Sequence, residues 1–290
     1  MKIECVVDAR ANVGEGPVWD GVAGVLWWTD IEGRKMHCYD PSTGTDREFS
    51  LAERVGSFAL REQGGFILAV DSGFAFWSPE RPDHLDYVHD PEPERAKNRF
   101  NDGCCDREGR FVASSMNLEE PKQPTGAIYR FDPNQSCVRL IDGIHIGNGI
   151  AFSPDGGTAY AADTVAQTVW KFRYDQAAGA LHDREVFIST EKLAGMPDGA
   201  TVDAEGRYWL AGVFGWHLYV FSPEGKLERT IDMPVKMPSR PMFGGEDLDE
   251  LYVTTIAGSG PLDPEQPQAG GLFRITGLGA QGLPEPRFKG

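Results

Sequence analysis

The sequence lacks any run of about 18 apolar residues, so it contains no candidate for a membrane-spanning helix. The stretch from Met1 to Asp8 also lacks the apolar centre of a signal peptide. There are only five cysteines, an odd number without a CxxC pair, which argues against a disulfide framework and for a reducing compartment. We therefore expect a cytoplasmic protein that does not bind a membrane.

Basic residues are also scarce. Only 28 Lys and Arg stand against 44 Asp and Glu, which gives a formal net charge of −16. Nucleic acids and anionic membrane surfaces are bound by clustered Lys and Arg, so the charge balance argues against both as partners. An acidic surface modestly favours the binding of cations.

Several common catalytic motifs are missing. The six histidines show no HxxxH or HExxH spacing, which argues against a zinc protease site. The sequence has no GxSxG nucleophile elbow, no P-loop and no strand-linked GxGxxG that opens a helix. Serine hydrolases of the α/β type and nucleotide-binding folds are therefore disfavoured.

Helical periodicity is nearly absent, and only residues 92–97 and 191–194 could form helical turns. Short runs rich in Val, Ile, Phe, Trp and Tyr instead alternate with turn residues, for which 35 glycines and 20 prolines provide the supply. The pattern repeats, because a strand, a tight turn and a second strand recur about every 40–50 residues. The repeats begin near Pro17, Phe58, Gly103, Gly149, Gly199 and Arg240.

This period predicts a six-bladed β-propeller with about four antiparallel strands per blade and a single domain over residues 1–290. A β-sandwich would need only about seven to nine strands and would show no such period. The inserts at 78–97 and 259–270 are expected to be surface loops.

Oxygen-bearing side chains recur just before the innermost strand of four blades, and each is followed by glycine. In a propeller these positions converge at one end of the central channel. Oxygen ligands suit Ca²⁺, Mg²⁺ or Mn²⁺, and the sequence leaves Zn²⁺ and Fe open. The simpler interpretation of each pair alone is a turn. The four residues are Glu15, Asp102, Asn148 and Asp198.

The segment 98–103 places one cation, two amides and one carboxylate within six residues. It is a candidate site at the entrance to a strand, or simply a loop that ends in an Asp-Gly turn. Ser239 and Arg240 stand at the sixth blade and could contact substrate, although a turn is the simpler interpretation. His145 could lie behind a metal ligand, but a surface or packing role is favoured.

The order and spacing of five motifs, at 12–19, 27–31, 99–103, 148–155 and 197–199, resemble the regucalcin (senescence marker protein) and gluconolactonase family over nearly the whole chain. The resemblance implies one divalent metal ion bound by Glu15, Asn148 and Asp198. It implies that Arg99 and Asn101 bind substrate hydroxyls.

The resemblance also places Glu119 at the substrate, with Glu120 beside it. The sequence departs from the family there, because Ser114-Ser115-Met116 stands where the family has Gly-Thr-Met. The implied activity is metal-dependent hydrolysis of a sugar lactone to the aldonic acid.

Asp198 is our candidate general base, since it can touch both the metal and the attacking water. Asp102 is expected in the outer shell of the metal or at a second cation. Two alternatives remain: a non-catalytic, cation-binding regulatory propeller, and a metal-dependent esterase or phosphotriesterase on the same fold. The second would favour an apolar pocket.

Overall fold

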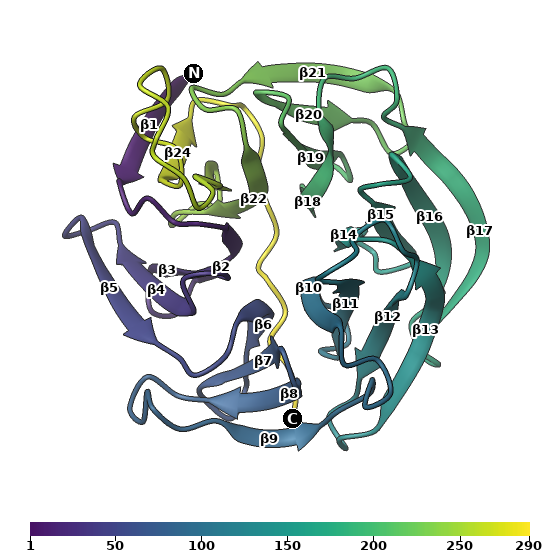
Figure 1. Ribbon diagram of the computed structural model, residues 1–290. Coiled ribbons are helices and arrows are strands. Elements are labelled where there is room, and N and C mark those ends of the chain that lie inside the picture. The colour runs from purple at the N-terminus through teal and green to yellow at the C-terminus, as the bar shows by residue number, and fades with distance from the viewer.

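The computed structural model describes residues 1–290 and consists of six four-stranded antiparallel sheets arranged around a central channel (Figure 1). The prediction of a six-bladed propeller with four strands per blade is confirmed. Residues 92–97 and 191–194 form turns that belong to no helix. No helix of the structure is long and apolar enough to cross a membrane.

Each blade runs from an innermost strand at the channel to an outermost strand at the rim (Figure 1). Blades 1 to 3 contain β2 (Gly14–Asp20), β3 (Val25–Asp30), β4 (Lys35–Asp40) and β5 (Thr45–Ser50); β6 (Val55–Leu60), β7 (Phe66–Val70), β8 (Gly73–Trp77) and β9 (Asp86–His89); β10 (Asn98–Cys105), β11 (Phe111–Asn117), β12 (Gly126–Phe131) and β13 (Cys137–Ile144). Blades 4 to 6 contain β14 (Gly147–Phe152), β15 (Thr158–Asp163), β16 (Thr168–Asp175) and β17 (Ala180–Ser189); β18 (Met196–Val202), β19 (Tyr208–Val213), β20 (His217–Phe221) and β21 (Leu227–Asp232); β22 (Pro238–Gly244), β23 (Glu250–Thr255), β24 (Leu272–Thr276) and β1 (Lys2–Val7).

The hydrophobic core lies between neighbouring blades. Innermost strands such as β2 and β6 are buried along their whole length, because a blade covers each face, whereas the outermost β5 is mostly exposed. Trp27 of blade 1 packs against Phe66 and Trp77 of blade 2, with ring centroids 4.7 and 6.3 Å apart. Repeated contacts of this kind hold the ring of blades together and fix the channel.

The ring is closed by the N-terminal strand, which the repeat pattern did not reveal. β1 pairs antiparallel with β24 and becomes the outermost strand of blade 6. Because β1 is separated in the sequence from the other three strands of blade 6, the repeat pattern gives no signal for it. Pairing the first strand of the chain with the last strand in one sheet ties the first blade to the last.

Two other expectations need correction. The insert 78–97 is not simply a loop, because it contains β9, the outermost strand of blade 2. The segment 98–103 is not a loop before a strand but lies within β10 itself. Residues 259–270 lie outside the strands, as expected.

A C-terminal segment, residues 277–290, crosses the axis of the ring, visible in yellow in Figure 1. We call it the distal strap. The Ala204 N–H donates to Gln281 O (2.8 Å), the Phe288 N–H donates to Leu60 O (2.8 Å), and the Lys289 N–H donates to Gly109 O (3.0 Å). These partners lie at the far ends of innermost strands or in the turns after them. The distal strap therefore covers one end of the channel and leaves the other end open for a site.

Candidate metal and substrate site

The innermost strand of every blade breaks its register with the second strand near the uncovered end of the channel. Such bulges turn side chains out of the sheet and are common beside active sites. In β2 the shift lies between Glu15 and Val18, and in β14 it lies between Asn148 and Ala151. Four of the six shifts lie at or beside a residue that the sequence singled out for its oxygen ligand.

Glycine has two different roles in these strands. Gly16 and Gly149, which follow Glu15 and Asn148, adopt φ of 54° and 59°, values that side chains disfavour. Gly103 and Gly199 have no such φ. A Cβ on Gly199 would lie 2.5 Å from Arg240 Cγ, so this glycine makes room for a crossing side chain. The sequence had suggested that the four Xaa-Gly pairs are equivalent, but the structure shows that they are not.

Glu15 and Asp198 bring two carboxylates into the buried part of the channel, where they are 7% and 6% exposed. Burial and then the negative charge of Asp102 raise the pKa of Glu15 to about 7. Burial and then the charges of Glu15 and Asp102 raise the pKa of Asp198 well above its ordinary range. The two carboxylates repel each other, and a cation between them would remove that cost.

The chemistry of this donor set fits a divalent cation. The side chain of Asp198 accepts no hydrogen bond from the protein and forms no ion pair, although it is almost fully buried. Glu15 Oε2 accepts one hydrogen bond, from the Gly16 N–H at 3.0 Å. Buried carboxylates with so few partners are costly unless a cation binds them. The residues that would hold such an ion are Glu15, Asp198 and Asn148.

Asn148 is held in one orientation from both sides. Its Oδ1 accepts a hydrogen bond from Asn101 Nδ2 at 3.0 Å, and its Nδ2 donates to Thr164 Oγ1 at 2.8 Å. The Thr164 hydroxyl in turn donates to Pro197 O at 2.9 Å, directly before Asp198. Thr164 thus links two predicted ligands, and the sequence gave no sign of it because its partners come from other strands.

Arg99 and Asn101 form a polar wall beside this centre. Arg99 Nη1 donates to Asn101 Oδ1 at 2.8 Å and to Phe100 O at 2.7 Å. Both residues are 8% exposed, and burial lowers the pKa of Arg99. The chain of contacts from Arg99 through Asn101 to Asn148 brings the predicted substrate-binding pair next to a predicted metal ligand.

Both carboxylate oxygens of Asp102 are engaged by the protein, and its expected role in the outer shell of the metal or at a second cation stays a prediction. Its Oδ1 pairs with Arg240 Nη1, and its Oδ2 accepts from the Ile150 N–H at 2.9 Å. Arg240 belongs to strand β22 rather than to a turn, and Nη1 also donates to Gly103 O at 2.8 Å. This fully buried pair is close enough for its charges to act on the pKa values of Glu15 and Asp198.

None of the hydrogen bonds or ion pairs of Glu119 reaches another predicted site residue. It stands on the loop after β11, mostly exposed, and its Oε2 pairs with Lys97 Nζ at 2.7 Å. Glu120 is exposed beside it, 3.8 Å from the same amine. His145 Nδ1 lies 2.8 Å from Asp163 Oδ2, which agrees with a packing role. The substrate contact of Glu119 stays a prediction.

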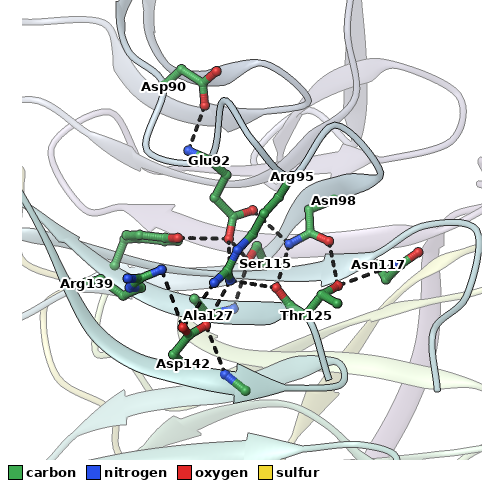
Figure 2. A network of polar contacts seen from close by, with 12 residues as sticks. Asp90, Glu92, Arg95, Asn98, Ser115, Asn117, Thr125, Ala127, Arg139 and Asp142 are labelled. Atoms are coloured by element: carbon green, nitrogen blue, oxygen red, sulfur yellow. Dashed lines mark hydrogen bonds and ion pairs between the residues drawn. The ribbon is translucent and has the colours of Figure 1, made fainter. Parts of the chain in front are cut away.

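A buried network anchors the segment that leads into Arg99, and Figure 2 shows it around Glu92. Glu92 accepts hydrogen bonds from Ser115 Oγ at 2.8 Å and Asn98 Nδ2 at 3.0 Å, while Asn98 Oδ1 accepts from Thr125 Oγ1 at 2.9 Å (Figure 2). These bonds join the insert before β10 to both ends of the loop that carries Glu119. The insert had been expected at the surface, which is why Glu92 was missed.

Comparisons with known proteins identify the family and agree with the fold. The family described as "SMP-30/Gluconolactonase/LRE-like region" matches residues 13–257. Regucalcin of Xenopus laevis is 36% identical over 299 residues, which cover 100% of this chain and 99% of the relative. A luciferin-regenerating enzyme superposes with a TM-score of 0.94 at 26% identity, over 99% of both chains. A calcium-binding protein, regucalcin, from Agrobacterium tumefaciens superposes with a TM-score of 0.91 at 27% identity, over 98% of this chain and 96% of that one. The chain therefore belongs to the SMP-30/gluconolactonase/LRE-like family.

Proposed function

We propose that the protein hydrolyses a sugar lactone with the help of a divalent cation held by Glu15, Asn148 and Asp198. The observation that carries the proposal is the side chain of Asp198, a nearly buried carboxylate without a protein partner beside the polar pair Arg99 and Asn101. Membership of a family that includes gluconolactonases supports the same reaction class.

A bound divalent cation would supply Lewis acidity toward the lactone carbonyl and charge stabilisation for the oxyanion that develops there. The three side chains offer only oxygen donors, which favours a hard ion such as Ca²⁺, Mg²⁺ or Mn²⁺. The calcium-binding relative from Agrobacterium tumefaciens is consistent with that preference.

Asp198 is proposed as the general base. Its carboxylate would take a proton from the water that attacks the carbonyl carbon, and the ring C–O bond would then break. The ring oxygen takes up a proton and becomes a hydroxyl, and the acyl carbon becomes the carboxyl group of the open-chain aldonic acid. With a cation beside it, Asp198 would be ionised near neutral pH and ready to accept the proton.

Arg99 and Asn101 would bind the hydroxyls of the sugar and hold the ring in one orientation. A wall of guanidinium and amide groups favours a polyhydroxylated substrate, because an esterase or phosphotriesterase with apolar substrates would need apolar surface here. This argument puts the sugar lactone ahead of the esterase alternative.

The test is a panel of aldonolactones assayed with and without a chelator, together with measurement of the bound metal. We expect hydrolysis that the chelator abolishes and that added divalent ion restores. Asp198→Asn should lower turnover by at least about a hundredfold. If no lactone of the panel is hydrolysed in a chelator-sensitive reaction, the proposal is rejected and a regulatory cation-binding propeller is favoured.

A further inference from the structure

A cavity of about 370 Å³ opens between blades 2 and 3, directly beside Arg99. It is lined on one side by the turn between β7 and β8, residues 71–73, and on the other by the segment 90–100 that enters β10. Its volume lies near the lower end of the range for small-molecule sites, about 300–1,000 Å³. Since Arg99 also bonds to Asn101, the cavity adjoins the site described above.

Two buried polar atoms in the residues that line this cavity have no partner. Arg99 Nε, a donor on a side chain that is 92% buried, makes no hydrogen bond, although Nη1 makes two. Asp71 Oδ1, an acceptor, is likewise buried and unpaired, while Oδ2 of the same carboxylate binds Arg54 Nη1 at 3.2 Å. Unpaired buried groups are rare and costly, so an unmatched donor and an unmatched acceptor on two residues that line one cavity favour a ligand there.

The chemistry of the two atoms selects the ligand. A hydroxyl group can accept from Arg99 Nε and donate to Asp71 Oδ1 at once, whereas a phosphate or carboxylate has no proton to give to Asp71. The other ionisable groups of the lining are already engaged: Glu53 with Ser72, and Arg95 with Asp142.

The charge of the lining points the same way. Four carboxylates against two arginines give it a net negative charge, which disfavours anionic groups. The carboxylates are Glu53, Asp71, Asp90 and Glu92.

We propose that this cavity is a second sugar subsite, which binds an uncharged glycosyl group attached to the lactone and shares one of its hydroxyls between Arg99 and Asp71. The proposal rests on the proposed lactonase function. It extends the substrate class from single aldonolactones to glycosylated, uncharged ones, and it makes Asp71 a specificity-determining residue.

The test blocks the cavity from its rim. Ala96 lines the cavity and is exposed, so Ala96→Trp would fill part of the cavity while leaving Arg99 and Asp71 themselves unchanged. Ala177, an exposed alanine in the turn between β16 and β17, provides the matched control Ala177→Trp. Thermal unfolding of both variants checks that they fold as the wild type does.

Two substrates, glucono-lactone and the glycosylated maltobiono-lactone, are compared by kcat/KM. We expect Ala96→Trp to lower the value for maltobiono-lactone about tenfold and to leave that for glucono-lactone within about twofold, while Ala177→Trp changes neither. Equal losses on both substrates, no loss on either, or failure of the wild type to turn over maltobiono-lactone while it hydrolyses glucono-lactone would overturn the subsite.

A binding measurement keeps the subsite separate from catalysis. Maltitol, an uncharged glycosyl alditol, is titrated calorimetrically into the wild type and the variants. We expect binding that Ala96→Trp abolishes and that Asp71→Asn weakens about fivefold or more, since the acceptor charge is lost. If no lactone is hydrolysed but maltitol binds in this pattern, the lactonase proposal fails and the sugar subsite stands. If lactones are hydrolysed and maltitol does not bind, the subsite fails alone.

Discussion

Arg240 of blade 6 reaches across the channel and pairs with Asp102 of blade 3, so that one buried ion pair joins opposite sides of the ring. Both side chains are almost completely buried. The pair keeps the charges of Asp102 and Arg240 matched, and both charges act on the pKa values of Glu15 and Asp198. The ion pair both links the two sides of the ring and contributes to the electrostatic environment of Glu15 and Asp198.

Breaking this pair should be costly. We expect Arg240→Met to lower the free energy of unfolding by about 3–5 kcal/mol, because Asp102 is left buried without its cation. Urea unfolding measures the change. The double variant Arg240→Met, Asp102→Leu should recover much of the loss, and strictly additive effects of the two substitutions would contradict the ion-pair interpretation.

Gly199 makes room for the crossing arginine. Gly199→Ala should lower the free energy of unfolding by about 1–3 kcal/mol, since the new Cβ would lie 2.5 Å from Arg240 Cγ and would displace that side chain. Gly260→Ala is the control, because its Cβ would meet no atom within 4 Å. Equal effects of the two substitutions in a urea titration would show that Gly199 has no special steric role.

The metal-free protein should lose stability as the pH rises from about 4.5 to about 7. In this window the folded state keeps a proton on Glu15, whose pKa is raised to about 7, while the unfolded chain has already released it. Each pKa unit corresponds to about 1.4 kcal/mol.

Chemical denaturation across this pH range, with a chelator present, measures the slope. Glu15→Gln should reduce it to the part that comes from Asp198, whose pKa is also raised. Metal affinity should follow the opposite course and rise with pH, since the cation competes with that proton. A metal-free protein whose stability does not change over this range would disprove the coupling.

Thr164 should act through the metal ligands that it holds. Thr164→Val keeps the shape of the side chain but removes the hydroxyl that links Asn148 Nδ2 to Pro197 O. We expect about tenfold weaker metal binding, the lower end of the range for residues that orient ligands. Thr168→Val, which removes an exposed hydroxyl bonded to Ala166 O, serves as control in the same titration. Unchanged affinity in Thr164→Val would rule out this positioning role.

Glu92 should position Arg99 indirectly, through its hydrogen bond to the neighbouring residue Asn98. Glu92→Gln cannot accept the hydrogen bonds of Asn98, Ser115 and Tyr129 in the same way, so stability should fall by about 1–3 kcal/mol. The KM for a lactone should rise more than kcat falls, because the segment leading into Arg99 is loosened. Glu94→Gln, an exposed neighbour, is the matched control. A purely structural role would lower stability and leave KM unchanged.

Much of the architecture could be read from the chain alone. The period of about 40–50 residues and the strand-and-turn pattern reflect local propensities and hydrophobic alternation, which act over short stretches. These were sufficient for six blades of four strands and for the oxygen-bearing residues at the inner strands. They did not reveal β1 as the outermost strand of blade 6, because closing the ring pairs the first strand of the chain with the last one.

The roles within the site depended on the folded ring. Asp102 and Asp198 look alike in the sequence, since each is an aspartate before a glycine at the start of a repeat. Only the fold separates them: Asp102 meets Arg240, 138 residues away, whereas the side chain of Asp198 is buried without a protein partner, which is why we propose it as a metal ligand. The physical reason is that charge pairing and burial depend on distances in space between blades, and no local pattern in the chain encodes which opposite side chain will cross the channel.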